Sequence, residues 1–392
     1  MQEDFHYYAT YCAAYLAGYT HEESMDICYG AQLVDLCSRT FLKKLKAPSS
    51  AATTQLQLEL MDAPTDRVGL QDITRIWASF HFLPYDLYAE KKHCSKRYLD
   101  KYRLICNSNG ALIKDTVMLA KDRDPGAVGI AMHVLADTWA HKYFAGTPSL
   151  VINNTNYYFF ELLSDRGRQI KFRHKAGAPD DPEIGEYTAT IYQSSENSIM
   201  NLGHGRAGHL PDYSFIRYMY LPAWGDYDEV VKDNPSDYYH AFCQMIYAMQ
   251  YLRGDHAEFE LDRYARDIAE PYKEEIQGII AKRRTDASCD WCAFGERLSG
   301  QAIEPFELNK YTREYLEAAP DEKDDTYLGR FIIAALRQKS MVTNKIFTSK
   351  NKLAGFSVNY KKRGFKGIKD FRKLLDENAK EEAQDVAVSE NN

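Results

Sequence analysis

The chain has 392 residues, 45% of them hydrophobic, and a formal net charge of −7 at pH 7. This length and hydrophobic content allow a sizeable buried core, so the composition excludes a disordered chain. The acidic balance excludes a broad electrostatic footprint for duplex nucleic acid, and we expect no such partner.

Apolar residues at spacings of three and four predict four helices in the first third of the chain, at about 5–18, 21–46, 67–80 and 114–122. Thr20 and Glu23 have the form of a capping box and mark the start of the second helix. Pro125 opens a central helix at about 126–144, which Gly146 and Pro148 close. The first part of the chain is therefore predicted to be a helical bundle.

The pattern changes between about 150 and 195. Residues 157–163 are aromatic and aliphatic, residues 164–167 are turn formers, and residues 169–173 alternate in polarity, which together predict a hairpin; a further strand is predicted at 187–192. Helices return at about 236–253, 256–283, 302–317 and 325–340. The predicted fold class is mainly α, a helical bundle with a small inserted β-hairpin or sheet at about 150–195.

We expect residues 1–340 to form a single domain and residues 341–392 to form a tail that is first basic, then acidic, and partly disordered. No signal peptide and no transmembrane segment is recognisable, so a cytoplasmic location is expected. Cys289 and Cys292 form a C-x-x-C pair without a second pair at zinc-finger spacing, and we leave them outside the predicted site.

The central helix carries His133, Asp137 and His141 at intervals of four residues, which places their side chains on one face. Their neighbours are apolar, so the helix is expected to be buried and its polar stripe to need an internal partner. A metal ion is one such partner, and a His–Asp hydrogen-bonded pair within the core is the alternative.

Further polar side chains of this kind stand in apolar or glycine-rich sequence: Asp4, His6, Asp35, His81, His204 and His209. Together with the central stripe they offer nitrogen and oxygen ligands without cysteine, which favours zinc, with iron or manganese as alternatives. Clustered divalent ions suit hydrolysis of a phosphoester through an activated water, and Asp35 is the predicted catalytic carboxylate that orients this water. Arg206 and Arg217 are candidates for binding the substrate phosphate, or for structural ion pairs.

The motifs D-F-H-Y-Y-A-T-Y, A-Q-x-V-D, F-H-F-L-P, M-H-V-x-A-D-T-W-A-H and G-H-G resemble those of an uncharacterised domain-of-unknown-function family of bacteria and fungi, over most of residues 1–253. More distantly, their order is similar to that of the zinc-dependent phospholipase C and single-strand-specific zinc nuclease superfamily. That resemblance implies a mainly helical protein with a zinc cluster. It matches His6, His81, His133 and Asp137 to ligands and Asp35 to the carboxylate near the attacking water. His141 matches a later ligand loosely.

Two departures from this superfamily point to one or two ions rather than three. The chain begins with Met-Gln-Glu where the superfamily has an N-terminal Trp ligand, and no H-x-x-x-E follows His204 and His209. The substrate class expected is a small-molecule or lipid phosphoester. Two rivals stay open: a di-iron carboxylate bundle built on Glu3-x-x-His6 and Glu90-x-x-His93, and a non-catalytic metal-stabilised binding protein with a tyrosine-lined cavity.

Overall fold

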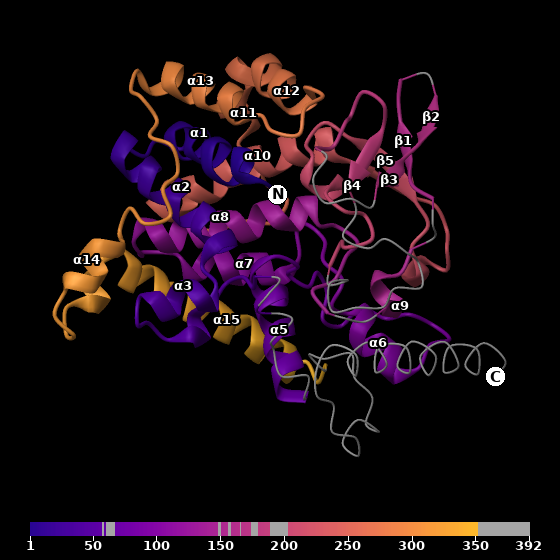
Figure 1. Ribbon diagram of the computed structural model, residues 1–392, viewed down its shortest axis with the longest axis horizontal. Coiled ribbons are helices and arrows are strands. Elements are labelled where there is room, and N and C mark those ends of the chain that lie inside the picture. The colour runs from indigo at the N-terminus through magenta and orange to yellow at the C-terminus, as the bar shows by residue number, and fades with distance from the viewer. Residues whose placement is uncertain are drawn as a thin grey trace.

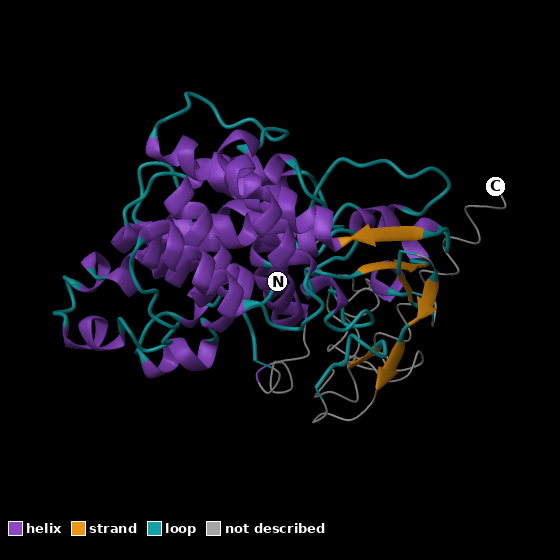
Figure 2. Cartoon of the chain, turned by 90° about the horizontal axis from the view of Figure 1, so that it is seen from above, coloured by secondary structure: helices purple, strands orange, loops and turns teal. Residues whose placement is uncertain are grey.

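The computed structural model describes residues 1–56, 59, 67–147, 150–155, 158–164, 166–173, 179–188 and 203–351. The protein is mainly helical, and its strands gather at one side of the helical body (Figures 1 and 2). A π-helical turn, η1 (Asp4–Ala9), precedes the first α-helix. The α-helices are α1 (Thr10–Leu16), α2 (His21–Leu36), α3 (Arg39–Lys44), α5 (Arg67–Phe80), α6 (Lys96–Tyr102), α7 (Ala111–Leu119), α8 (Pro125–Ala140), α9 (Leu150–Asn153), α10 (Asn234–Arg253), α11 (Arg266–Ala269), α12 (Lys273–Ala281), α13 (Ser288–Ser299), α14 (Thr312–Glu317) and α15 (Tyr327–Thr348).

The predicted central helix is α8, and it lies at the middle of the bundle. Its residues from Gly126 to Ala140 are all buried. Figure 1 shows it between α2 and α10 on one side and α7 and α15 on the other, and it contacts all four. Asp124 caps its start by accepting a hydrogen bond from the Gly126 N–H at 3.0 Å, and Pro125 occupies the first turn, where it costs no hydrogen bond.

Glycines allow α2 and α8 to approach each other closely. A Cβ atom at Gly129 would lie 2.4 Å from the carbonyl oxygen of Ile27, and one at Gly30 would lie 3.0 Å from the Cα atom of Gly126. Any larger residue at either position would force the two backbones apart. The polar stripe of α8 is therefore held directly against the backbone of α2.

The β region contains a four-stranded antiparallel sheet in the order β2-β1-β5-β6 and a parallel pair, β3-β4. The predicted hairpin is confirmed, with Glu161 paired to Arg168. The sheet extends beyond the predicted range of 150–195, because two later strands complete it. The strands are β1 (Phe160–Leu162), β2 (Gly167–Gln169), β3 (Lys171–Arg173), β4 (Glu186–Thr188), β5 (Arg217–Tyr220) and β6 (Val230–Asp233).

Several predicted helix boundaries differ from the structure. The helix predicted at 21–46 is divided into α2 and α3, because Cys37 and Ser38 leave the helical conformation and Ser38 caps α3 through the Phe41 N–H at 3.1 Å. Helices α6, α9 and α13 were not predicted. Of the predicted α-helices at 256–283 and 302–317, the structure has only α11 and α12 in the first range and α14 at the end of the second. Helix α15 continues to Thr348, past the predicted boundary at 340, and the predicted tail from residue 352 onward lies outside the described residues.

Among the described residues, no helix combines the length and the apolar character that crossing a membrane requires.

Candidate metal centre

Three segments of the chain bring histidines to one carboxylate, that of Asp137. His6 lies in η1, His81 directly follows α5, and His133 precedes Asp137 by one turn on α8. The Nε2 atom of His6, the Nδ1 atom of His81 and the Nε2 atom of His133 each lie 3.2 Å from an oxygen of Asp137. The facing nitrogens of His81 and His133 are 3.3 Å apart. The structure thus brings four predicted ligands into one buried group, the first group, within which His6, His133 and Asp137 form a triad that could hold a metal ion.

A second group of candidate ligands adjoins the first and consists of His141, His204 and Asp212. His141 is the C-cap of α8, one residue beyond the helix end, and its Nε2 atom lies 3.2 Å from Oδ1 of Asp212. The Nε2 atom of His204 lies 3.6 Å from the other oxygen of Asp212. The predicted stripe on α8 is therefore shared between two groups, with His133 and Asp137 in the first and His141 in the second.

Four of these histidines direct their second ring nitrogen at a backbone carbonyl oxygen. The pairs are His133 Nδ1 with Ala31 at 2.9 Å, His81 Nε2 with Thr53 at 3.0 Å, His141 Nδ1 with His81 at 2.7 Å, and His204 Nδ1 with Gly208 at 2.7 Å. An N–H that donates to a carbonyl fixes the tautomer and leaves a lone pair on the opposite nitrogen. The opposite nitrogen faces the Asp137 carboxylate in His81 and His133, and the Asp212 carboxylate in His141 and His204. A metal ligand requires such a free lone pair directed at the site.

Local sequence explains two of these placements. The close approach of α2 and α8 at Gly30 and Gly129 puts the Ala31 carbonyl within reach of His133. Gly203 has φ of +61°, and a Cβ atom there would lie 2.0 Å from the ring of Phe82, so the loop can lie on this ring only with glycine at that position. His204 follows immediately, so the path of this loop places it in the second group, next to His141 and Asp212.

The N-terminal amine also lies in the cluster. The Met1 nitrogen is buried, 2.8 Å from Oδ1 of Asp137 and 3.3 Å from Oδ1 of Asp212. Burial opposes its charge, but Asp137 and Asp212 outweigh burial and raise the pKa of the amine to about 11. A positive group therefore occupies the point where the two carboxylates converge, which is the place that suits a cation.

Two histidines and both carboxylates have the charge states of a metal site, whereas at His81 burial is outweighed by the carboxylates of Asp137 and Asp35, which raise its pKa. Burial, together with the positive charge of neighbouring groups, lowers the pKa of both His6 and His204 to about 4, so each is neutral at pH 7. Although burial alone would raise it, His141 and the N-terminal ammonium hold the pKa of Asp137 well below its usual range. Burial is likewise outweighed at Asp212, chiefly by His204. Neutral imidazole and ionised carboxylate are the forms that bind divalent metals.

Neither ring nitrogen of His6 meets the geometry of a hydrogen bond among the described residues, although the residue is fully buried and its Nε2 contacts the Asp137 carboxylate at 3.2 Å. Its ring stacks on that of His133 with centroids 3.8 Å apart. A buried nitrogen left without a partner is costly, and coordination of an ion by Nε2 would satisfy one of the two atoms.

Asp35 lies at the rim of the first group. Its oxygens are 3.8 to 3.9 Å from the facing nitrogens of His6, His81 and His133, and its side chain is 29% exposed, whereas that of Asp137 is 1% exposed. Together with His81 and His133 it forms a further triad that could hold a metal ion, and it is also open to water.

Other predicted site residues lie outside these two groups. The Asp4 carboxylate accepts a hydrogen bond from the Ala287 N–H at 3.1 Å, and burial raises the pKa of Asp4 to about 6. His209 is 59% exposed and approaches Asp212 at 3.2 Å without belonging to a candidate group. Arg217 is half exposed and pairs with Asp233 across β5 and β6. Arg206 is partly buried on the same loop as His204.

Asp212 and the Met1 amine were not among the predicted ligands. The sequence offered a signal for Asp212, because it stands three residues after His209 in the predicted loop. No sequence motif predicts that the Met1 amine lies in the cluster, since its position depends on how η1 is oriented. Neither Glu90 nor His93 belongs to a candidate group among the described residues, so the di-iron pairing gains no support.

Comparison with known proteins identifies a family. The model of a family of unknown function (DUF6765) matches residues 1–346, and the chain belongs to this family. Comparison with curated proteins and with solved structures finds no match. The matched range includes both candidate ligand groups and ends within α15.

Proposed function

We propose that this member of the family is a metal-dependent hydrolase that acts on a phosphoester, either a phosphodiester or a phospholipid-type ester. The observation that carries the proposal is the convergence of oriented histidine nitrogens on the Asp137 and Asp212 carboxylates inside the protein. Nitrogen and oxygen ligands without sulfur suit zinc, with iron or manganese as alternatives.

The two groups supply two ion positions. In the first group His6, His133 and Asp137 would hold one ion, with His81 beside them, and in the second His141, His204 and Asp212 would hold another. A bound divalent ion acts as a Lewis acid on the phosphoryl oxygen and lowers the pKa of water toward neutrality. The backbone carbonyls that accept from the rings of His81, His133, His141 and His204 hold these four ligands in one tautomer before the ion arrives, so little reorganisation is needed.

Asp35 is the proton acceptor of this proposal. It lies within 4 Å of three ligand nitrogens and is the most exposed carboxylate of the first group. At that position it can accept a proton from an attacking water and release it to solvent. Asp137, which is almost fully buried, stays in place as a ligand.

The resemblance to the zinc-dependent phospholipase C and nuclease superfamily supports a phosphoester substrate. His6, Asp35, His81 and the His133–Asp137 pair follow its ligand order along the chain.

A non-catalytic, metal-stabilised binding protein is the second candidate. It is favoured by the burial of His6, His81, His133 and Asp137, since four protein ligands are enough to close a structural site. The tyrosine-lined cavity of this reading gains less support: the largest fully buried tyrosines, among them Tyr11, pack within the core.

Metal analysis and a substrate panel separate the two candidates. The protein should carry its purification tag at the C-terminus, because the Met1 amine lies in the cluster. We expect one to two equivalents of a divalent metal per chain, together with turnover of at least one of a phosphodiester, a phosphomonoester and a phosphatidylcholine substrate. Stoichiometric metal without turnover of any of the three would favour the structural candidate, and absence of metal would refute both.

A further inference from the structure

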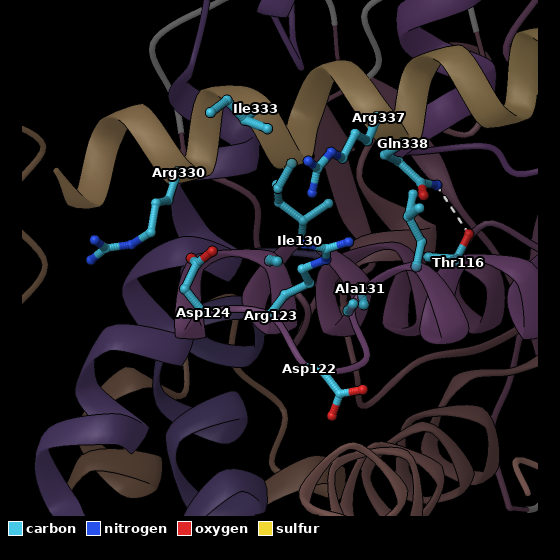
Figure 3. A pocket seen from close by; sticks show the side chains of 14 residues that line it. Thr116, Asp122, Arg123, Asp124, Ile130, Ala131, Arg330, Ile333, Arg337 and Gln338 are labelled. Carbon is cyan, nitrogen blue, oxygen red and sulfur yellow. Dashed lines mark hydrogen bonds between the residues drawn. The ribbon is translucent and has the colours of Figure 1, made fainter. Parts of the chain in front are cut away.

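A cavity of about 290 Å³ lies between α7, α8 and α15 (Figure 3). Its walls are largely aliphatic and include Leu119, Ala127, Ile130 and Ile333. At one end it is closed by Gln338, whose amide donates to the Thr116 hydroxyl at 3.0 Å and to the Ser79 carbonyl at 3.0 Å. The volume is at the small end of the range for ligand pockets.

Two arginines from different elements extend into this cavity. Figure 3 shows the side chains of Arg123, which precedes α8, and Arg337, on α15, directed toward the space over Ile130. Within the described part of the chain, neither guanidinium group forms an ion pair or a side-chain hydrogen bond. Both arginines are exposed, so water screens the repulsion between them, and an anion placed between them would be attracted by both.

The other charged residues that line the cavity are Arg330, Asp122 and Asp124, and both carboxylates keep their negative charge there. Arg330 donates to the Asp325 carbonyl, and Figure 3 shows it pointing away from the other two arginines. Asp124 is engaged in capping α8 through one of its oxygens, and Asp122 is directed away from the cavity in the same view. Arg123 and Arg337 are therefore the two positive charges directed at the space that a ligand would fill.

We propose that this cavity binds a small amphiphilic anion, with its carboxylate or phosphate group between Arg123 and Arg337 and its short aliphatic part against Ile130 and Ile333. Guanidinium groups match planar or tetrahedral oxyanions through paired hydrogen bonds. An inorganic anion would leave the aliphatic walls unused, and a neutral lipid would leave the two charges unpaired. The inference is independent of the proposed hydrolase activity, since it uses no residue of the metal centre.

Calorimetric titration of the full chain with octanoate, octyl phosphate, hexanoate, inorganic phosphate and octyl glucoside tests the proposal. We expect saturable binding of octanoate or octyl phosphate, and the tighter of the two identifies the anionic group. Two fewer methylenes should weaken binding by about 15-fold from octanoate to hexanoate. Inorganic phosphate and octyl glucoside should bind at least tenfold more weakly than the best ligand.

Variants locate the binding. Arg123→Gln and Arg337→Gln should each weaken binding by roughly tenfold, because each removes charge-assisted hydrogen bonds. Ala334→Phe should abolish it by filling the cavity. Arg313→Gln, an exposed arginine on α14 outside the cavity, is the matched control and should bind as the parent does. Both arginine positions are exposed, so these two variants should fold normally.

The proposal is overturned if no amphiphilic anion binds. It is equally overturned if octyl glucoside binds as tightly as octanoate and octyl phosphate, or if the arginine variants bind like the Arg313→Gln control.

Discussion

Replacing Asp137 by Asn tests the candidate metal centre most directly, because it removes one charge and almost no volume. The carboxylate lies 2.8 Å from the Met1 ammonium and 3.2 Å from three histidine nitrogens. With an effective dielectric constant of about 20, Coulomb's law gives roughly 6 kcal/mol for the ammonium contact at 2.8 Å. Asp212 remains 3.3 Å from the amine and the amine can lose its proton, so the expected net loss is smaller, about 3 to 5 kcal/mol in the metal-free protein.

The assay is urea unfolding of the chelator-treated protein at pH 7, with elemental analysis of the untreated protein. The control is Asp115→Asn, which breaks the exposed Asp115–Lys345 ion pair of 2.9 Å and should cost less than about 1 kcal/mol. Asp137→Asn should also lose the ion of the first group. If Asp137→Asn unfolds at the same urea concentration as Asp115→Asn and keeps its metal, the Asp137 carboxylate neither stabilises the cluster nor binds the ion.

Three further predictions follow from the same geometry. Asp35→Asn should keep its metal and lose turnover by roughly 100-fold to 10,000-fold, because Asp35 lies at the rim as a proton acceptor; loss of metal in this variant would instead identify it as a ligand. His204→Ala should lower the metal content by up to one equivalent, whereas His209→Ala, which removes a largely exposed ring, should bind metal normally, and equal losses in both variants would contradict the division into two groups. Folding lowers the pKa of His6 and His204 from 6.5 to about 4, so their contribution to stability is present above pH 6.5 and is lost as the pH falls toward 4. Asp4 and His81, whose pKa values are raised, act in the opposite direction, so the test is a comparison: the urea midpoint of the metal-free protein should fall more across this window than that of metal-free His204→Ala, and equal falls would exclude a neutral, buried His204.

Much of the candidate site could be predicted because its residues are polar side chains in apolar helical sequence. The spacing of His133 and Asp137 on a buried helix is a local pattern, and the structure places both in the first group. His6, Asp35 and His81 are recognisable for the same reason, since each is polar among aromatic or aliphatic neighbours.

The rest depends on tertiary structure that no local pattern contains. Asp4 has the same sequence context as His6, but two residues correspond to about half a helical turn, so its carboxylate meets Ala287 instead of the cluster. Asp212 follows a loop whose path is set by the packing of Gly203 on Phe82. The pairing of β5 and β6 with the predicted hairpin is equally non-local, because β1 pairs with Tyr218 and Met219 across more than fifty residues.

Gly30 and Gly129 bear no ligand atom, yet they fix how near Ala31 comes to the imidazole of His133. A random-mutagenesis screen for loss of bound metal should therefore return substitutions at these two glycines beside those at histidine and aspartate. Such variants would be misread as general folding defects if stability alone were scored. Variants at Gly30 or Gly129 that lose metal but retain a cooperative unfolding transition would show that the site depends on the spacing between α2 and α8.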